Sequence, residues 1–157
     1  MSQVNDPTYK VCKILADILN PLTTTGQSYI ENADGLKNFF SKLSVDPVDI
    51  QASFDVVALY PSIPIPKALE CVRRRLLNDT TLKERTDWKP DDIMKLLEIC
   101  LEIHFKTIDG NIYTQLDVTP IGKSISGTIA DIFMIWFEKE FVFNECNEFQ
   151  SYLKAWK

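Results

Sequence analysis

The sequence has few of the residues that build zinc sites or disulfide frameworks. It contains one histidine, His104, and four cysteines that are scattered without a pair at metal-ligand or redox spacing. A zinc site built from histidine and cysteine is therefore not expected. Because no N-terminal signal peptide precedes the cysteines, a reducing, intracellular setting is the simpler expectation.

Long hydrophobic runs are also missing. The longest apolar run, Ile132 to Phe137, ends at a charged trio and is far shorter than the roughly 20 residues that cross a bilayer. No membrane-spanning helix is expected. With 157 residues, 45% of them hydrophobic, the chain can still bury a sizeable core, which fits one domain or a large piece of one.

An excess of positive charge is absent too. The 17 Lys and Arg residues against 22 Asp and Glu residues give a net charge of -5. This is the wrong sign for a chain that holds nucleic acid by neutralising phosphates. A nucleic-acid enzyme that contains this chain would need basic surfaces on its other parts.

Apolar residues at helical spacing predict five helices. The last of them is apolar on most of its circumference, so it is expected to cross the core. The asparagine and proline at positions 20 and 21 are expected to end the first helix. The predicted helices cover Pro7 to Leu19, Asp34 to Leu43, Pro66 to Leu77, Pro90 to Leu101 and Ser124 to Asn147.

Two regions predict β-structure. The β-prone stretch Gln51 to Leu59 is typical of a buried strand and carries a single acid, Asp55. Further on, Asp109-Gly110-Asn111 separates two β-prone segments, residues 105–108 and 112–115, and glycine supplies the positive φ of a tight hairpin turn. The order of helices and strands predicts an α+β domain.

Asp55 is the strongest candidate for chemistry on physical grounds. An acid inside an apolar strand costs several kcal/mol unless it is paired or coordinates a cation. A strand end followed by a turn rich in proline can hold a hard divalent ion through side-chain and backbone oxygens. An edge-strand aspartate that faces water is the alternative.

The string S-F-D-V-V-A-L-Y-P-S-I-P-I, Ser53 to Ile65, resembles motif A of reverse transcriptases, particularly those of Penelope-like retroelements. The resemblance implies that Asp55 ligates two catalytic Mg²⁺ ions, with the backbone carbonyl of Val56 beside it. It also implies that Tyr60 excludes the ribose 2'-hydroxyl of the incoming nucleotide by a steric penalty. A core or turn aromatic is the alternative for Tyr60.

A second stretch, I-Y-T-Q-L-D-V-T-P-I-G-K-S-I-S-G-T-I-A-D-I-F-M, Ile112 to Met134, resembles motif B, whose loop and helix support the template and the new base pair. The resemblance implies that Gly122 makes the closest backbone approach, since it has no Cβ to obstruct a base or sugar. Pro120 and Lys123 would then contact template or primer, with Lys123 touching a phosphate. A solvated surface lysine is the alternative.

Motif B departs from the usual pattern at three positions. Val118 stands where relatives usually have glycine, and Lys123 and Gly127 replace the commoner S-P and second proline. The loop is therefore expected to be altered.

The resemblance covers most of the chain, because Pro7 to Leu19 also resembles the helix after the fingers motif of Penelope-like elements. It implies a partial right-hand palm, with helices packed on a small antiparallel sheet. Residues 1–45 would form a helical segment at the junction of fingers and palm, and residues 46–157 a partial palm. The Y-x-D-D of motif C, which supplies the second metal carboxylate, would come just after Lys157.

The function implied is that of an RNA-directed DNA polymerase fragment, with an RNA template, a DNA primer and deoxynucleoside triphosphates as partners. Two-metal phosphoryl transfer needs carboxylates from more than one segment, so the chain alone is expected to be inactive. A nuclear location follows from the family only.

Two other functions stay open. A truncated or domesticated remnant that binds a partner without catalysis is favoured by the acidic pI and the altered motif B. A metal-dependent nuclease or phosphatase would use Asp55, Asp109 and Asp117, although Asp109 is better explained as a turn residue.

Overall fold

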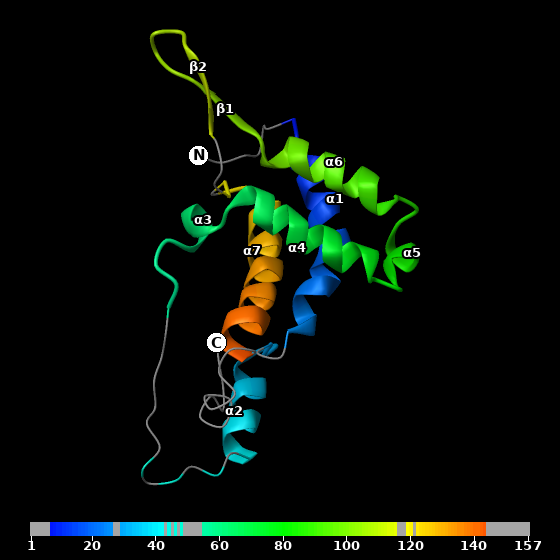
Figure 1. Cartoon of the computed structure of the whole chain (residues 1–157), viewed down its shortest axis with the longest axis vertical. Coiled ribbons are helices and arrows are strands. Elements are labelled where there is room, and N and C mark those ends of the chain that lie inside the picture. Colours follow the sequence, from blue (N-terminus) through cyan, green and yellow to red (C-terminus); the bar gives the residue numbers. More distant parts are fainter. Residues whose placement is uncertain are drawn as a thin grey trace.

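The computed structural model describes residues 7–26, 29–42, 44, 46, 48, 55–115, 119–120 and 122–143. Within these ranges the chain is mostly helical (Figure 1). The helical elements are α1 (Tyr9–Leu19), η1 (Asn20–Thr25), α2 (Ala33–Lys42), α3 (Leu59–Ser62), α4 (Ile65–Leu77), α5 (Leu82–Arg85), α6 (Pro90–Leu101), α7 (Ser124–Phe137) and η2 (Glu138–Phe143).

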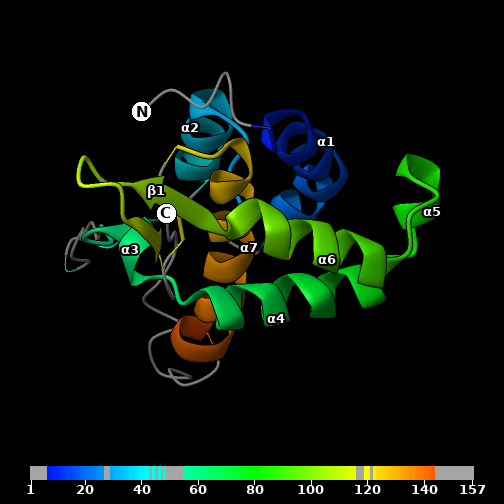
Figure 2. The ribbon, with the colours of Figure 1, turned by 90° about the horizontal axis from the view of Figure 1, so that it is seen from above.

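Helix α7 runs through the body of the molecule and contacts α1, α3, α4 and η1 (Figures 1 and 2). Its residues Ile125, Ile129 and Ile132 are fully buried. Their spacing places them on one side of the helix, where they form the middle of the core. The prediction that the last helix crosses the core is confirmed. The α-helix ends at Phe137, and the π-helical segment η2 follows it directly. Residues 144–147 of the predicted helix lie outside the described residues.

The other long helices are amphipathic and turn their apolar faces to α7 or to one another. Helix α4 contacts α7 and α6, and α1 contacts α7 and α6. All four predicted helices before α7 are confirmed within the described residues, and α1 ends before Asn20-Pro21 as expected. Their fully buried large side chains are Leu15 and Leu19 of α1, Val72 and Leu76 of α4, and Ile93 and Leu97 of α6.

Helix α2 is the exception, because it has the predicted apolar face without burying it. Leu36, Phe39 and Phe40 are all exposed, and α2 has no buried residue. The rings of Phe39 and Phe40 contact each other edge to face.

The strands β1 (Ile103–Lys106) and β2 (Ile112–Gln115) form the predicted antiparallel hairpin, in which Lys106 pairs with Ile112. Gly110 adopts φ 90°, as the tight turn requires. The turn also closes through a hydrogen bond from the Thr107 amide to the Asn111 carbonyl. Figure 1 shows the hairpin projecting away from the helices.

The expected α+β class, with helices packed on a palm sheet, is wrong. The described residues are predominantly helical, and their only strands are those of the projecting hairpin. The strand predicted over Gln51 to Leu59 is absent from its described part, where residues 55–58 are irregular and α3 begins at Leu59. Ala58 adopts left-handed φ 51° and ψ 51°, a conformation that ends an extended chain. Residues 51–54 lie outside the described residues.

No helix in the described ranges combines the length and the apolar character that crossing a bilayer requires.

A partly buried ion pair fastens the segment between α4 and α6 to α1. Asp79 pairs with Arg85, whose Nε also donates to the carbonyl of Ile18 at 3.0 Å. Burial alone would raise the pKa of Asp79, but the hydrogen bonds from Thr81 and Arg85 outweigh it and hold this pKa below its usual range. The pair therefore stabilises the fold only while Asp79 is ionised.

Asp79→Asn is expected to lower the free energy of unfolding by about 1–3 kcal/mol at pH 6, because it removes charge-assisted hydrogen bonds from a buried site. The folded pKa is depressed, so this stability is present above the unfolded pKa of about 3.9 and is lost as the pH falls through the folded value. Denaturant titrations at pH 6 and pH 3 should show that the free energies of unfolding of the variant and its parent differ less at pH 3 than at pH 6. The matched control is Asp91→Asn, since Asp91 forms an exposed ion pair with Arg73 and should cost little at either pH. Equal losses in the two variants at pH 6 would contradict the assignment.

Candidate functional site

Asp55 lies in the irregular segment before α3, and its side chain is exposed. The expectation of an acid buried within an apolar strand is therefore wrong. Because the carboxylate faces solvent, it has no burial penalty that a cation would have to offset. Val56 is also exposed, so the carboxylate of Asp55 and the segment beside it are accessible to a ligand.

Tyr60 lies in α3 and packs against α7. Its ring is half-buried against the core, and so is the aliphatic side chain of Leu59. A Cβ added to Gly127 of α7 would lie 4.0 Å from the Tyr60 hydroxyl oxygen, so the hydroxyl sits over this turn of the helix. Gly127 is one of the positions at which motif B departs from the usual pattern, and here it leaves room beside the tyrosine.

A buried hydrogen bond joins the loop before α7 to the segment after α3: the Thr119 hydroxyl donates to the carbonyl of Ile63 at 3.3 Å. A second buried bond, from the Ser126 hydroxyl to the carbonyl of Pro120 at 2.5 Å, holds the same loop on the first turn of α7. The two stretches that resemble motifs A and B, far apart in sequence, therefore lie side by side. Pro120 is fully buried, so in this structure its ring contacts the protein core and not a surface.

Gly122 has a conformational reason to be glycine. Its φ is 93°, in the left-handed region that other residues rarely adopt, and the residue is exposed. The predicted close approach to a nascent base pair stays a prediction, but the exposed backbone at this point is compatible with it.

Lys123 is buried, with 6% of its side chain exposed. Its ammonium donates to the carbonyl of Cys100 at 2.5 Å and to that of Glu102 at 3.3 Å, at the C-terminal end of α6. A cation at this position complements the helix dipole and binds a carbonyl left over at the helix end. Lys123 therefore fastens the motif-B-like loop to α6, and a phosphate contact would require the ammonium to leave these carbonyls. The last turn of α6 has no basic residue of its own that could bind these carbonyls.

Lys123→Met is expected to lower the free energy of unfolding by about 1–3 kcal/mol, because the variant keeps the apolar stem but removes a charged donor from two carbonyls. Thermal or denaturant unfolding followed by circular dichroism measures the loss. Lys95→Met is the control, since Lys95 is an exposed lysine of α6. If both variants are as stable as the unaltered chain, the contacts of Lys123 contribute nothing to the fold.

The described residues include no group of three or more His, Cys, Asp or Glu side chains that could hold a metal ion. The oxygens of Asp55 and of the Val56 carbonyl are donors of the kind that Mg²⁺ prefers. The donor chemistry fits magnesium, and a two-ion site needs at least one further carboxylate.

The nuclease alternative gains no support from Asp109. This residue lies in the turn of the β1–β2 hairpin, where its carboxylate accepts hydrogen bonds from the side chains of Thr107 and Asn111. These bonds, that from Thr107 first, lower the pKa of Asp109. The contacts are those of a turn residue. Asp117, the third member of that set, lies outside the described residues.

No known protein family, curated protein or solved structure matches this chain.

Proposed function

We propose that this chain is part of an RNA-directed DNA polymerase, a reverse transcriptase of retroelement origin. The observation that carries the proposal is the packing of α3 on α7, with Tyr60 over Gly127 and the Thr119 hydroxyl bonded to Ile63. The two segments that resemble polymerase motifs thus meet in space, as a shared nucleotide site requires. The chemical roles of the individual residues are those that the resemblance to reverse transcriptases implies.

In this proposal Asp55 holds magnesium through its carboxylate, and the Val56 carbonyl assists. When bound, the metal supplies Lewis-acid stabilisation of charge on the transferring phosphoryl group. The exposure of Asp55 supports the role, because the side chain is accessible without rearrangement of the core. A carboxylate from another segment has to complete the site, so the 157-residue chain by itself is proposed to be inactive.

Tyr60 has the role of a steric filter for the sugar. Its ring is held by α7 on one side and remains half-exposed, which fixes its position while leaving part of it open to a substrate. A fixed ring beside the 2'-carbon excludes a hydroxyl there by clash. The substrate class is therefore deoxynucleoside triphosphates, with an RNA template and a DNA primer.

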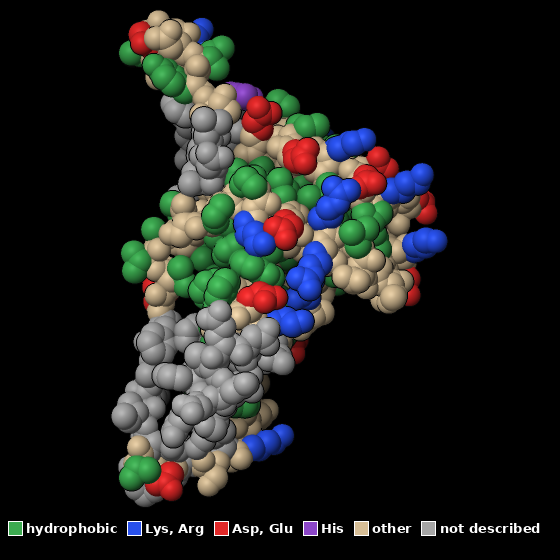
Figure 3. All heavy atoms as spheres, viewed as in Figure 1, with side chains coloured by type: hydrophobic (Ala, Val, Ile, Leu, Met, Phe, Trp, Pro, Cys, Tyr) green, Lys and Arg blue, Asp and Glu red, His purple; other side chains and the backbone are tan. Residues whose placement is uncertain are grey.

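The template and primer are proposed to contact other parts of the polymerase more than this chain. On the face shown in Figure 3, Lys and Arg side chains over α4, α5 and α6 are interspersed with Asp and Glu. Such a mixed surface gives little of the phosphate neutralisation that holds nucleic acid. An intracellular setting belongs to the same proposal, and a nuclear one rests on the family resemblance alone.

The deciding experiment begins with the transcript. An in-frame Y-x-D-D within about ten to fifteen residues beyond Lys157 would supply the missing carboxylate, and the longer protein should then incorporate deoxynucleotides on an RNA template with Mg²⁺. A stop codon directly after Lys157 would instead favour the non-catalytic remnant. Incorporation by purified residues 1–157 would contradict the proposed inactivity of the chain alone.

A remnant that binds a partner without catalysis is the second candidate, and the hairpin favours it. Ile108 of the turn and Ile112 and Tyr113 of β2 are exposed, and in the described residues each strand pairs only with the other. Open edges with apolar side chains tend to pair with further strands. Light scattering at high concentration tests this idea, and a strictly monomeric chain would contradict it.

A further inference from the structure

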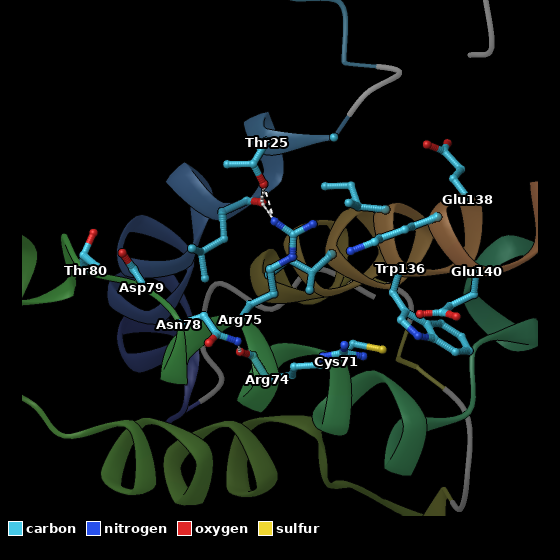
Figure 4. A pocket seen from close by; sticks show the side chains of 15 residues that line it. Thr25, Cys71, Arg74, Arg75, Asn78, Asp79, Thr80, Trp136, Glu138 and Glu140 are labelled. Atoms are coloured by element: carbon cyan, nitrogen blue, oxygen red, sulfur yellow. Dashed lines mark hydrogen bonds between the residues drawn. The ribbon is translucent and has the colours of Figure 1, made fainter. Parts of the chain in front are cut away.

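A cleft of about 590 Å³ opens between η1, the C-terminal half of α4 and the junction of α7 with η2 (Figure 4). Asp55, Tyr60 and Gly122 are not among the residues that line it, so it is separate from the candidate polymerase site. Its volume lies in the range typical of small-molecule sites. Its lining includes Leu22, Arg74, Arg75, Ile132, Trp136 and Lys139.

Arg75 extends across the cleft with a positive charge that no carboxylate among the described residues balances by an ion pair. Its guanidinium donates to the hydroxyl of Thr25 and to the carbonyl of Leu22, which are both neutral (Figure 4). The side chain is half-buried, and burial lowers the pKa of Arg75. A partly desolvated guanidinium with neutral partners gains most from an anion.

Two further cations line the same cleft. Arg74 and Lys139 are exposed, and neither forms an ion pair within the part of the chain that the structure describes. Together with Arg75 they place three positive charges around the cavity, which is also lined by the carboxylates of Asp79, Glu138 and Glu140.

The acids of the cleft do not cancel this charge at Arg75. Asp79 is engaged by Arg85. Figure 4 shows Glu138 and Glu140 on the side of Trp136, away from the Arg75 guanidinium. The Lys67 ammonium lies over the Trp136 ring, 4.6 Å from its centre, and the rings of Phe133 and Phe141 also contact Trp136, so this residue forms a wall of the cleft.

The cleft also has an apolar side, made by Leu22, Ile132 and Ile135. A charged end beside an apolar wall fits an organic anion better than a bare inorganic ion. We propose that this cleft binds a small organic phosphate monoester of nucleoside monophosphate size, with Arg75 as its central phosphate ligand and Arg74 and Lys139 beside it.

Isothermal titration of the full chain with adenosine 5'-monophosphate, inorganic phosphate and adenosine tests the proposal. The nucleotide is expected to bind more tightly than either fragment, because only it engages both the cations and the apolar wall. Arg75→Gln should weaken nucleotide binding by about tenfold or more, the effect of losing a charge-assisted hydrogen bond. Lys83→Gln is the matched control, since Lys83 is an exposed lysine of α5 outside the cleft, and it should leave the affinity unchanged.

Arg75 also bonds to η1, so circular dichroism has to show that Arg75→Gln is folded. If it is not, the double variant Arg74→Gln with Lys139→Gln decides, because both side chains are exposed, and its affinity should fall by several-fold. No nucleotide binding at millimolar concentration, or unchanged affinity in the folded variants, would overturn the proposal. Equal affinity for inorganic phosphate and the nucleotide would show that the organic group of the ligand contributes nothing, which would overturn the proposed ligand class. Binding of a single-stranded oligonucleotide without binding of the mononucleotide would overturn the proposal that the ligand is a small molecule.

Discussion

Asp55→Asn is expected to lower template-dependent deoxynucleotide incorporation by at least about 10³-fold in a polymerase that contains this chain. The substitution keeps the size of the side chain but removes the charge that would hold magnesium. A metal contributes several kcal/mol of transition-state stabilisation, and each 1.36 kcal/mol corresponds to a factor of ten in rate. Primer extension on an RNA template with Mg²⁺ measures the change.

Because Asp55 is exposed, this experiment can separate an effect on activity from an effect on stability. Substitutions of exposed residues away from structural features usually change stability by less than about 0.5 kcal/mol, so the variant should unfold at the same denaturant concentration as its parent. Asp87→Asn is the matched control, because Asp87 is an exposed acid outside both motif-like segments. Full incorporation by Asp55→Asn would show that Asp55 is only a solvated loop acid.

The helices could be predicted from sequence because each has its own local signal. In α7 the apolar residues recur so densely that burial on most sides is the only stable arrangement, and the structure places Ile125, Ile129 and Ile132 in the core. The hairpin could also be predicted from a local signal, because its turn needs the positive φ of Gly110.

The strand over Gln51 to Leu59 failed because β-propensity depends on context. Val56 and Val57 favour a strand only if a neighbouring strand and a core cover them. Here Val57 is 86% exposed, and the left-handed Ala58 directs the chain into α3. With this strand absent from the described part, the buried-acid argument for Asp55 also failed, and the motif resemblance became the remaining reason to single it out.

The roles of Lys123 and Arg75 could not be predicted because their partners are distant in sequence. The Lys123 ammonium binds carbonyls of residues 100 and 102, and the Arg75 guanidinium binds residues of η1 about fifty positions earlier. A lysine or arginine is most often solvated, and no local pattern distinguishes one whose head group is directed inward. Only the folded chain brings these partners together, by placing α4 beside η1 and the loop before α7 beside the end of α6.

Tyr60→Ala is expected to raise incorporation of ribonucleotides relative to deoxynucleotides by about 10²-fold, the discrimination that one hydroxyl in an apolar site provides. The variant also loses a half-buried ring from the α3–α7 contact, so it should be less stable than its parent. Measuring the ratio of the two kcat/KM values removes this loss, because a smaller fraction of folded enzyme lowers both rates equally.

Two further variants separate sugar exclusion from packing. Tyr60→Phe keeps the ring and should keep the discrimination. Gly127→Ala adds a methyl group at an ordinary contact distance, 4.0 Å from the Tyr60 hydroxyl, so it should leave the ratio unchanged while altering the same contact. If Tyr60→Ala loses stability but keeps the parent's discrimination, then Tyr60 is a packing residue that joins α3 to α7. In that case the resemblance to motif A would extend to the aspartate and not to the sugar filter.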